Sequence, residues 1–287
     1  MKIACIILNY NTSSDCQKCA SFLLKQKDAD LELIFVDNHS SNEDRGNLHK
    51  YCLQYGLTFL FSQNNKGYNA GNNIGLRYAA DKGYKYVLIT NPDMEFPQHN
   101  YLSKMIETME KNPSIAVCGS DIITPEGIHQ NPMKRDGNWK NSFGWLTRFL
   151  KKKPANSYSF IDNYEYSHYC SKVSGCCLMV RMSFIEEIGY FDENIFLYCE
   201  EAILSKQVER SGKWKMYYLS EAQATHRHIK SEKGNPIARF KQWKESRIYY
   251  INHYSNDSWF GKKIAIISLS LNILATTSAL YVKRMLK

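Results

Sequence analysis

The chain of 287 residues is long enough for one large or two ordinary domains. Its residues are 44% hydrophobic and 13% aromatic, which allows a large core and excludes a disordered or collagen-like chain. A total of 37 Lys and Arg against 28 Asp and Glu gives a net charge of +9, which predicts an anionic partner: nucleic acid, acidic lipid or a phosphorylated small molecule.

Up to residue 125, short apolar runs alternate with segments of helical period. The expected strands are 2–8, 31–36, 58–61, 86–90 and 115–118, and the expected helices are 14–26, 42–55, 70–82 and 100–111. Apolar strands separated by helices predict a mainly parallel sheet that is covered on both faces. Ligands of such sheets bind at the carboxyl ends of the strands, so the residues after each strand are site candidates.

The second half of the chain breaks this rhythm. Residues 131–170 are basic and aromatic without a βα pattern, which predicts an inserted loop or a short helical excursion. The elements expected after it are a strand at 172–180, helices at 183–188 and 200–211, the second ended by Gly212, and a strand at 215–219.

Residues 264–282 form an uncharged segment between Lys262-Lys263 and Lys283-Arg284. At helical rise the segment would cover most of a bilayer's hydrocarbon core, but Ser, Thr and Asn side chains dilute its apolar character. We expect membrane association. A full span, a helix lying in the interface and a helix packed on a partner subunit all stay open.

The nine cysteines are an odd number for a closed disulfide framework, and most lie in apolar runs. They predict reduced core thiols in a cytosolic chain. Cys16 and Cys19 form a C-x-x-C pair, for which a buried helix stripe is favoured over a zinc or redox site. Residues 1–8 are too short for a signal-peptide core and predict a buried strand.

Polar residues follow the first two strands. Asn9-Tyr10-Asn11 follows the first, and Asp37-Asn38-His39-Ser40 follows the second. An acid in this position can accept a hydrogen bond from a base N–H or a ribose hydroxyl. The structural alternative is an Asx turn and helix cap.

Residues 65–75 open the third expected helix with glycines spaced G-x-x-x-G-x-x-x-G. The spacing matches neither the dinucleotide fingerprint nor a P-loop. A helix N-terminus still favours phosphate, with close helix–sheet packing as the alternative.

Asn91-Pro92-Asp93 ends the fourth strand, where Pro92 interrupts the hydrogen-bonded ladder. Asp93 is a candidate ligand for a divalent cation that bridges a diphosphate. A solvated turn aspartate is the alternative.

Residues 189–201 are an aromatic-rich approach to a helix that begins with Glu200 and Glu201. Acids in a first helical turn are ordinarily explained by the macrodipole, but aromatic surroundings make one of them a candidate general base. His226 and His228 are weak metal candidates, with surface histidines as the default.

Taken in this order, the motifs resemble those of the inverting glycosyltransferases of family 2, and most closely their rhamnosyltransferase-like branch. The similarity covers about residues 1–230. The matching segments are I-I-L-N-Y-N at 6–11, V-D-N-x-S at 36–40, N-x-G-x-x-x-G-x-N-x-G at 65–75, N-P-D at 91–93, S-G-C-C-L-M-V-R at 174–181 and G-Y-F-D-E-x-x-F-x-Y-x-E-E at 189–201.

This resemblance implies the GT-A fold, an α/β three-layer sandwich with a mainly parallel central sheet. The implied organisation is a GT-A domain at 1–230, a helical extension at 231–260 and a hydrophobic C-terminal helix at 261–287. The resemblance further implies that Asp37 contacts the nucleobase and that Asp93 and His226 hold Mg2+ or Mn2+ at the sugar diphosphate. The implied donor-binding residues are Asn9, Asn11, Asp37, Asn65, Gly67, Asn69, Gly71, Asn72 and Asn91, and the acceptor-side residues are Gly175, Asp192 and Tyr198.

Two motifs depart from the family pattern. Asn91-Pro92-Asp93 stands in place of D-x-D and leaves one carboxylate for the cation. Glu200-Glu201-Ala202-Ile203-Leu204 stands in place of E-D-x-D-L, so Glu201, with Glu200 beside it, occupies the position of the catalytic base and is one methylene longer. The segment 131–170 has no counterpart that can be aligned.

The resemblance implies an inverting transfer of a sugar, with rhamnose as one candidate, from a dTDP- or UDP-sugar to a hydroxyl of a lipid-linked or polysaccharide acceptor. It places the chain in cell-surface glycan synthesis at the cytoplasmic face of a bacterial inner membrane, without nucleic acid as a partner and with a homodimer left open. An inactive nucleotide-sugar-binding relative and a nucleotidyltransferase are the alternatives. The sequence does not specify the sugar, the acceptor or the linkage.

Overall fold

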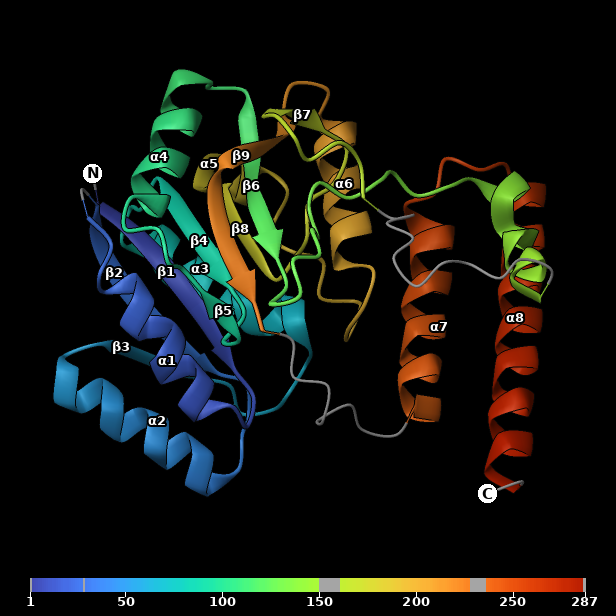
Figure 1. The fold of residues 1–287 in the computed structure, drawn as a ribbon, viewed down its shortest axis with the longest axis horizontal. Coiled ribbons are helices and arrows are strands. Elements are labelled where there is room, and N and C mark those ends of the chain that lie inside the picture. The colour runs from blue at the N-terminus through green and yellow to red at the C-terminus, as the bar shows by residue number, and fades with distance from the viewer. Residues whose placement is uncertain (1, 28, 150–160, 228–235, 286–287) are drawn as a thin grey trace.

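The computed structural model describes residues 2–27, 29–149, 161–227 and 236–285. A central sheet lies between two layers of helices, and a pair of C-terminal helices stands at one side (Figure 1). The predicted three-layer α/β fold is therefore confirmed.

The sheet has nine strands in the order β3-β2-β1-β4-β8-β6-β9-β5, with β7 beside β9. β8 runs antiparallel to both neighbours and β5 and β7 run antiparallel to β9, while the other pairs are parallel. The strands are β1 (Lys2–Asn9), β2 (Asp30–Asp37), β3 (Thr58–Phe61), β4 (Tyr86–Thr90), β5 (Met94–Glu95), β6 (Ile115–Ile123), β7 (His168–Cys170), β8 (Cys177–Arg181) and β9 (Lys215–His226).

Helices cover both faces because successive side chains of a strand point to opposite sides. Along β1, Ile3, Cys5 and Ile7 enter one core with α1, α2 and α4. Ala4 and Ile6 enter a second core with α3, α5 and α6. The helices are α1 (Ser13–Leu23), α2 (Asn42–Tyr55), α3 (Tyr68–Asp81), α4 (Tyr101–Lys111), the 3-10 helix η1 (Trp139–Phe149), α5 (Met182–Glu187), α6 (Glu200–Ser211), α7 (Pro236–His253) and α8 (Trp259–Met285).

Three expectations about the strands need correction. The strand expected at 172–180 begins only at Cys177, because residues 173–176 form a turn that leads into β8. The strand expected at 215–219 continues to His226, with a register irregularity against β6 after Leu219. β5 and β7 were not expected at all, because strands of two or three residues carry too little periodicity to be detected. Within the insert, η1 is the predicted helical excursion.

The cysteines are free thiols. Cys16 and Cys19 lie on the buried face of α1, as the sequence predicted for a core-facing stripe. Burial raises the pKa of both thiols well above the usual value, which makes them poor nucleophiles.

α7 and α8 form a third apolar cluster with α6 and η1. Ile203 of α6, Tyr250 of α7 and Leu269 of α8 are buried in it. In the described part of the chain, α8 included, we find no helix whose length and apolarity suffice for crossing a membrane.

Candidate active site

A large cavity, about 620 Å³, opens at the carboxyl ends of β1 and β4 beside the N-terminus of α3. The sequence pointed to four of its residues, Asn65, Gly67, Asn91 and Asp93. It did not point to Gln242, which α7 supplies to the cavity. The cavity lining is Leu8, Tyr10, Thr12, Asp15, Asn38, Asn65, Gly67, Tyr68, Asn91, Pro92, Asp93, Phe196, Leu197 and Gln242.

Asn9 and Asp37 form a buried hydrogen-bonded network rather than part of the cavity lining. Asn9 Nδ2 donates to Asp37 Oδ2 at 3.0 Å and to Asp44 Oδ2 at 2.7 Å. Arg45 Nε donates to Asp37 Oδ1 at 2.9 Å, and the Ser40 backbone N–H donates to the same oxygen at 3.2 Å. Both Asn9 and Asp37 are fully buried, so in this structure they fix the two strand ends to each other. Contact of Asp37 with a nucleobase stays a prediction.

Asn38 reaches the cavity that Asp37 does not. Its side chain is 3% exposed, and its Nδ2 donates to Asn65 Oδ1 at 3.0 Å and to the Gly67 carbonyl at 3.1 Å. Among the described residues, Oδ1 of Asn38 finds no hydrogen-bond partner. A buried acceptor without a partner is costly, so this oxygen is a candidate to receive an N–H or hydroxyl from a ligand. The V-D-N-x-S motif includes Asn38 but predicts no role for it.

The glycines of residues 65–75 allow neighbouring segments of the chain to approach the backbone closely. Gly67 has φ +97°, and a Cβ there would lie 2.0 Å from the Phe196 carbonyl oxygen, which accepts a hydrogen bond from the Tyr68 N–H. A Cβ at Gly71 would lie 2.6 Å from Leu8 Cδ1. The first glycine therefore brings residues 196–197 to the cavity, and the second seats α3 on β1. Donor binding by Gly67 and Gly71 stays a prediction.

The remaining predicted donor-binding asparagines mostly bond within the protein. Asn69 Nδ2 donates to the Asp192 carbonyl at 2.8 Å, and Asn72 Nδ2 donates to the Tyr68 carbonyl at 3.0 Å. Asn11 is exposed outside the cavity, and its Oδ1 accepts from the Ser41 N–H at 2.8 Å. Asn91 lines the cavity, and its N–H donates to the Cys176 carbonyl at 2.8 Å.

Asp93 and His226 come together at the edge of the cavity. Nε2 of His226 lies 3.1 Å from Asp93 Oδ2, and its Nδ1 lies 2.8 Å from Gln130 Oε1. Burial lowers the pKa of His226, but hydrogen bonding to Asp93 and Cys176 outweighs burial and raises it to about 10. A metal ion bound at Nε2 would have to displace that proton.

Asp93 and His226 suit a cation that a substrate also coordinates, rather than a cation coordinated by protein side chains alone. Within the described residues, no three His, Cys, Asp or Glu side chains gather as a metal site. One carboxylate and one imidazole suit Mg2+ or Mn2+ when phosphate oxygens and water complete the coordination. His228 lies outside the described residues.

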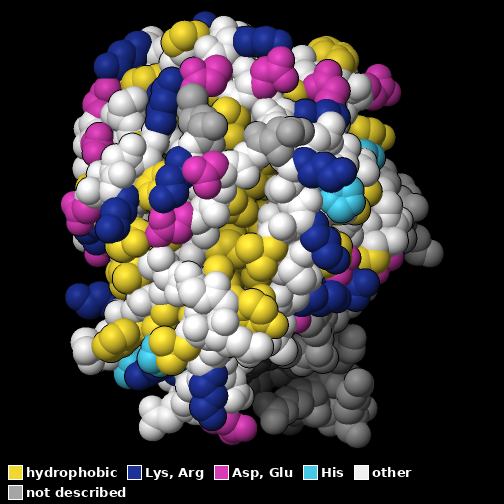
Figure 2. Space-filling model, turned by 90° about the vertical axis from the view of Figure 1, so that its left-hand side faces the viewer, with side chains coloured by type: hydrophobic (Ala, Val, Ile, Leu, Met, Phe, Trp, Pro, Cys, Tyr) yellow, Lys and Arg dark blue, Asp and Glu magenta, His cyan; other side chains and the backbone are white. Residues whose placement is uncertain are grey.

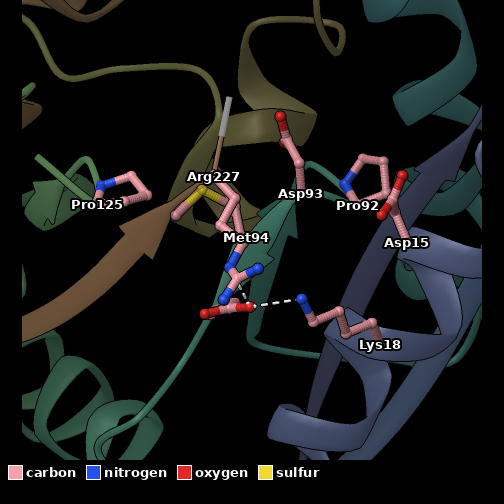
Figure 3. Close-up of a pocket in the computed structure, with 8 residues that line it drawn as sticks. Asp15, Lys18, Pro92, Asp93, Met94, Pro125 and Arg227 are labelled. Carbon is pink, nitrogen blue, oxygen red and sulfur yellow. Dashed lines mark ion pairs between the residues drawn. The ribbon is translucent and has the colours of Figure 1, made fainter. Parts of the chain in front are cut away.

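A second cavity of about 420 Å³ adjoins Asp93 on its other side (Figure 3). Lys18 Nζ lies 2.9 Å and Arg227 Nε 2.6 Å from Glu95 Oε1, while the Asp93 side chain points away from this ion-paired group. Burial and the nearby Asp93 charge raise the pKa of Asp15, which lines both cavities. None of the three ion-paired residues was singled out from sequence, because single charges on α1 and at a strand end carry no motif.

Glu200 and Glu201 begin α6 and turn their carboxyls to different partners. Glu200 Oε1 accepts from the Tyr198 N–H at 2.6 Å, and Glu201 Oε1 accepts from the Gly175 N–H at 3.2 Å. Burial, together with the charge of Glu201, raises the pKa of Glu200 to about 8. Protonation of Glu200 is therefore favoured compared with a free carboxyl group.

Tyr68 connects the glutamates with the large cavity. It lines that cavity, and both glutamate charges contribute to raising the pKa of its buried hydroxyl well above the usual value, after burial itself. Its hydroxyl donates to the Gly175 carbonyl at 2.5 Å, while the Gly175 N–H donates to Glu201. The backbone of a single residue, Gly175, thus ties the N-terminus of α3 to the N-terminus of α6.

The backbone before α6 is strained. Tyr198 and Cys199 have φ of +74° and +68°, a region that non-glycine residues rarely occupy. Such strain gathers at functional sites and persists only where the surroundings enforce it. Here it aims the Tyr198 N–H at Glu200. The resemblance implies an acceptor-side place for Tyr198. The strain itself could not be predicted from sequence, because neither Tyr nor Cys is a residue type that favours positive φ.

Asp192, the other predicted acceptor-side residue, is engaged by α7. Its Oδ2 accepts from the Tyr249 hydroxyl at 2.8 Å and the Tyr254 hydroxyl at 2.7 Å, and its Oδ1 accepts from the Asn194 N–H at 2.9 Å. In this structure Asp192 anchors the helix that supplies Gln242 to the cavity. A contact with the acceptor stays a prediction for Asp192 and for Gly175.

Known proteins share both the sequence pattern and the fold. A family model described as glycosyl transferase family 2 matches residues 4–189. The low-salt glycan biosynthesis hexosyltransferase Agl10 of Haloferax volcanii is 29% identical over 201 residues, which is 69% of this chain and 59% of that protein. The N-acetylglucosaminyl-diphospho-decaprenol L-rhamnosyltransferase of Mycobacterium tuberculosis is 23% identical over 180 residues, which is 61% of this chain and 57% of that protein. The chain thus spans less than two thirds of the length of either relative.

Two solved glycosyltransferase structures share the fold. The mannosyltransferase PcManGT from Pyrobaculum calidifontis, in complex with GDP-Man and Mn2+, matches 96% of this chain and 75% of its own, with a TM-score of 0.59 and 12% identity. GalNAc-T7 with UDP, GalNAc and Mn2+ matches 93% of this chain and 54% of its own, with a TM-score of 0.61 and 15% identity. At these identities the likeness establishes the GT-A fold.

Proposed function

The chain belongs to glycosyl transferase family 2, and from this premise we propose that it transfers a hexose-type sugar from a nucleotide-diphosphosugar to a hydroxyl group, with inversion at the anomeric carbon. The observation that carries the proposal is the cavity of about 620 Å³ that is bordered by Asn38, Asp93 and Tyr68. It is large enough for a nucleotide sugar and lies where ligands of parallel sheets bind.

The donor is a UDP- or dTDP-sugar, with rhamnose as one candidate sugar. Asn38 Oδ1 supplies a buried acceptor for the nucleoside, and Leu8 and Tyr10 supply apolar surface for the base. The relatives named for hexosyl and rhamnosyl transfer support this class of donor.

Asp93 and His226 would hold Mg2+ or Mn2+ together with the donor diphosphate. A cation bound there supplies positive charge to the departing nucleoside diphosphate. The two neighbouring structures that contain Mn2+ with a nucleotide ligand support a divalent cation for this fold.

Glu201 acts as the general base. It accepts the proton of the acceptor hydroxyl as that oxygen bonds to the anomeric carbon, and the bond from this carbon to the diphosphate oxygen breaks. Burial and the charge of Glu201 raise the pKa of Glu200, so protonation of Glu200 is favoured beside the proposed base. The Gly175 N–H fixes the orientation of the Glu201 carboxylate.

The acceptor is a lipid-linked or polysaccharide glycan at the cytoplasmic face of a membrane. The net charge of +9 suits an anionic lipid diphosphate and an anionic surface. The relative whose name includes a diphospho-decaprenol supports the lipid-linked option.

A panel of nucleotide sugars tests the proposal. A true donor raises the melting temperature of the protein in the presence of Mn2+ and releases its nucleoside diphosphate when a lipid-linked acceptor is added. A nucleotidyltransferase would instead break the bond between the two phosphates and release a sugar 1-phosphate, and an inactive relative would bind the donor without releasing either product.

A further inference from the structure

α8 exposes apolar side chains on the face turned away from the protein. Ile267, Leu271 and Leu274 are 56%, 45% and 63% exposed, and their spacing of four and three residues places them on one side of the helix. Phe260 lies one heptad before Ile267 and is 62% exposed. α8 is the outermost element on its side of the molecule (Figure 1).

The opposite face of α8 is already in use. Ala265 and Leu269 are buried in the cluster with α7, and Ser268 is buried against η1, where it accepts from Trp145 Nε1 at 3.0 Å and donates to the Ser142 carbonyl at 2.8 Å. Gly261 makes room for Trp139, since a Cβ there would lie 2.5 Å from its ring. The helix is therefore fixed in rotation, and the exposed stripe cannot turn inward.

A surface helix ordinarily has a polar outer face, whereas α8 is apolar on both faces. A contiguous exposed apolar stripe of this kind marks an interaction site. η1, which packs against α8, adds exposed Phe143 and Leu146 to the same helical unit.

The charged residues within α8 have one sign. Residues 259–285 include no Asp or Glu, while Lys262 and Lys263 flank the first turn and Lys140 of η1 is exposed. By contrast, the side of the molecule shown in Figure 2 intersperses Lys and Arg with Asp and Glu. An acid-free apolar helix with basic flanks complements an anionic lipid surface.

We propose that the outer face of α8, formed by Phe260, Ile267, Leu271 and Leu274, docks the protein on an anionic bilayer surface, with the helix lying in the interface. The inference rests on the proposed function, which supplies the reason to meet a membrane. A second copy of the chain is a poorer complement, because its own α8 would bring further lysines and no acid to pair with them.

α7 connects this surface to the active site. It packs against α8 and donates from Ser246 Oγ to the Leu197 carbonyl at 2.7 Å, and Leu197 and Gln242 both line the large cavity. Docking through α8 therefore holds the cavity at a fixed position relative to the lipid surface, where a lipid-linked acceptor would be presented.

Vesicle flotation of the full chain tests the proposal. The parent is expected to float with vesicles of phosphatidylcholine that contain about 30% phosphatidylglycerol and much less with phosphatidylcholine alone, and raising NaCl from about 0.1 to 0.5 M should weaken the binding. The triple variant Ile267→Ser/Leu271→Ser/Leu274→Ser should lose at least about tenfold in vesicle partitioning. Leu24→Ser/Leu53→Ser, which changes exposed apolar residues just after α1 and on α2, should bind like the parent.

Equal circular dichroism and melting temperature for the triple variant and the parent establish that the fold is intact. Vesicle binding of the triple variant at the parental level would overturn the proposal. So would a dimeric parent that the triple substitution converts to a monomer, since a second copy would then cover the stripe. Calorimetry of UDP and dTDP in vesicle-free solution reports on the proposed function separately, and the triple variant should retain the parental affinity.

Discussion

The polar groups behind the two walls of the cavity of about 620 Å³, outside its lining, differ in how they are paired. On the side of β1 and β2, the Asp37 carboxylate is fully buried and receives hydrogen bonds from Asn9, Ser40 and Arg45. On the opposite side, burial lowers the pKa of His226, but its hydrogen-bond partners outweigh burial and raise the pKa to about 10. Burial raises the pKa of Glu200 to about 8.

The difference separates groups that fix the position of the backbone from groups that are suited to take part in the reaction. A carboxylate that is buried and fully hydrogen-bonded contributes to positioning, because its oxygens are already engaged by neighbouring donors. Shifted pKa values and strained backbone gather where proton transfer and charge development take place. The first wall, around Asp37, is called the scaffold wall, and its substitution should mainly affect stability. The second wall, around His226 and Glu200, is called the reactive wall, and its substitution should mainly affect turnover.

The largest effect is expected on the reactive wall from Glu201→Gln. The substitution removes the proton acceptor but keeps the size of the side chain, so turnover should fall by about 100-fold or more while donor affinity and melting temperature stay at the parental level. Glu201→Asp should retain part of the activity. Steady-state sugar transfer and donor calorimetry measure the two quantities.

Glu209→Gln on the same helix is the matched control, because Glu209 pairs with Arg135 and Lys206 far from the cavity lining. It should leave turnover unchanged. Parental turnover in Glu201→Gln together with inactivity of Glu200→Gln would assign the base to Glu200 instead.

On the scaffold wall, Arg45→Met should cost about 2 kcal/mol of unfolding free energy. Removal of one partner of a buried pair leaves an uncompensated charge, and the partial exposure of Arg45 places the effect below the range for fully buried pairs. Chemical denaturation measures it. Arg77→Met, which breaks the exposed pair with Glu193, should cost less than about 1 kcal/mol. Equal losses in both variants would mean that the Asp37 network has no special structural role.

At the edge between the walls, Asp93→Asn should remove the gain in nucleoside diphosphate affinity that Mn2+ provides, a loss of about tenfold or more. The amide keeps the size of the side chain but removes the charge that attracts the cation. Calorimetry of UDP and dTDP with and without Mn2+ checks the prediction, with Asp81→Asn at the exposed end of α3 as the control. A Mn2+ effect of parental size in Asp93→Asn would exclude Asp93 as a ligand.

The fold and the loops of the reactive wall could be predicted from sequence because they are local. Apolar strands, Gly212 at the end of α6, and acids after strand ends all have signals within a few residues. The order of strands in the sheet and the antiparallel course of β8 depend on distant pairings, for which a single sequence carries no comparable signal.

Details of the site depend on such distant contacts as well. Gln242 reaches the cavity only because α7 is anchored on Asp192 by Tyr249 and Tyr254. Likewise, whether Asp37 or Asn38 faces the cavity is decided by the position of Arg45 and by the contact of Gly67 with Phe196. These choices are made by packing among segments far apart in the chain, which motifs do not encode.

The smallest predicted effect concerns pH and again separates the walls. Because burial raises the pKa of Glu200 from 4.5 to about 8, the folded state binds a proton that the unfolded state releases between those values. This contribution to stability is full below about pH 4.5 and is lost as the pH rises toward 8, with a slope of at most about 1.4 kcal/mol per pH unit. His226, whose pKa is also raised, adds a slope of the same sign only above about pH 6.5.

Between about pH 5 and 6 the parent should therefore lose stability relative to Glu200→Gln, while Glu186→Gln, on the exposed end of α5, should follow the parent. Parallel curves for the parent and Glu200→Gln in urea denaturation over this interval would contradict a raised pKa of Glu200 in the folded protein.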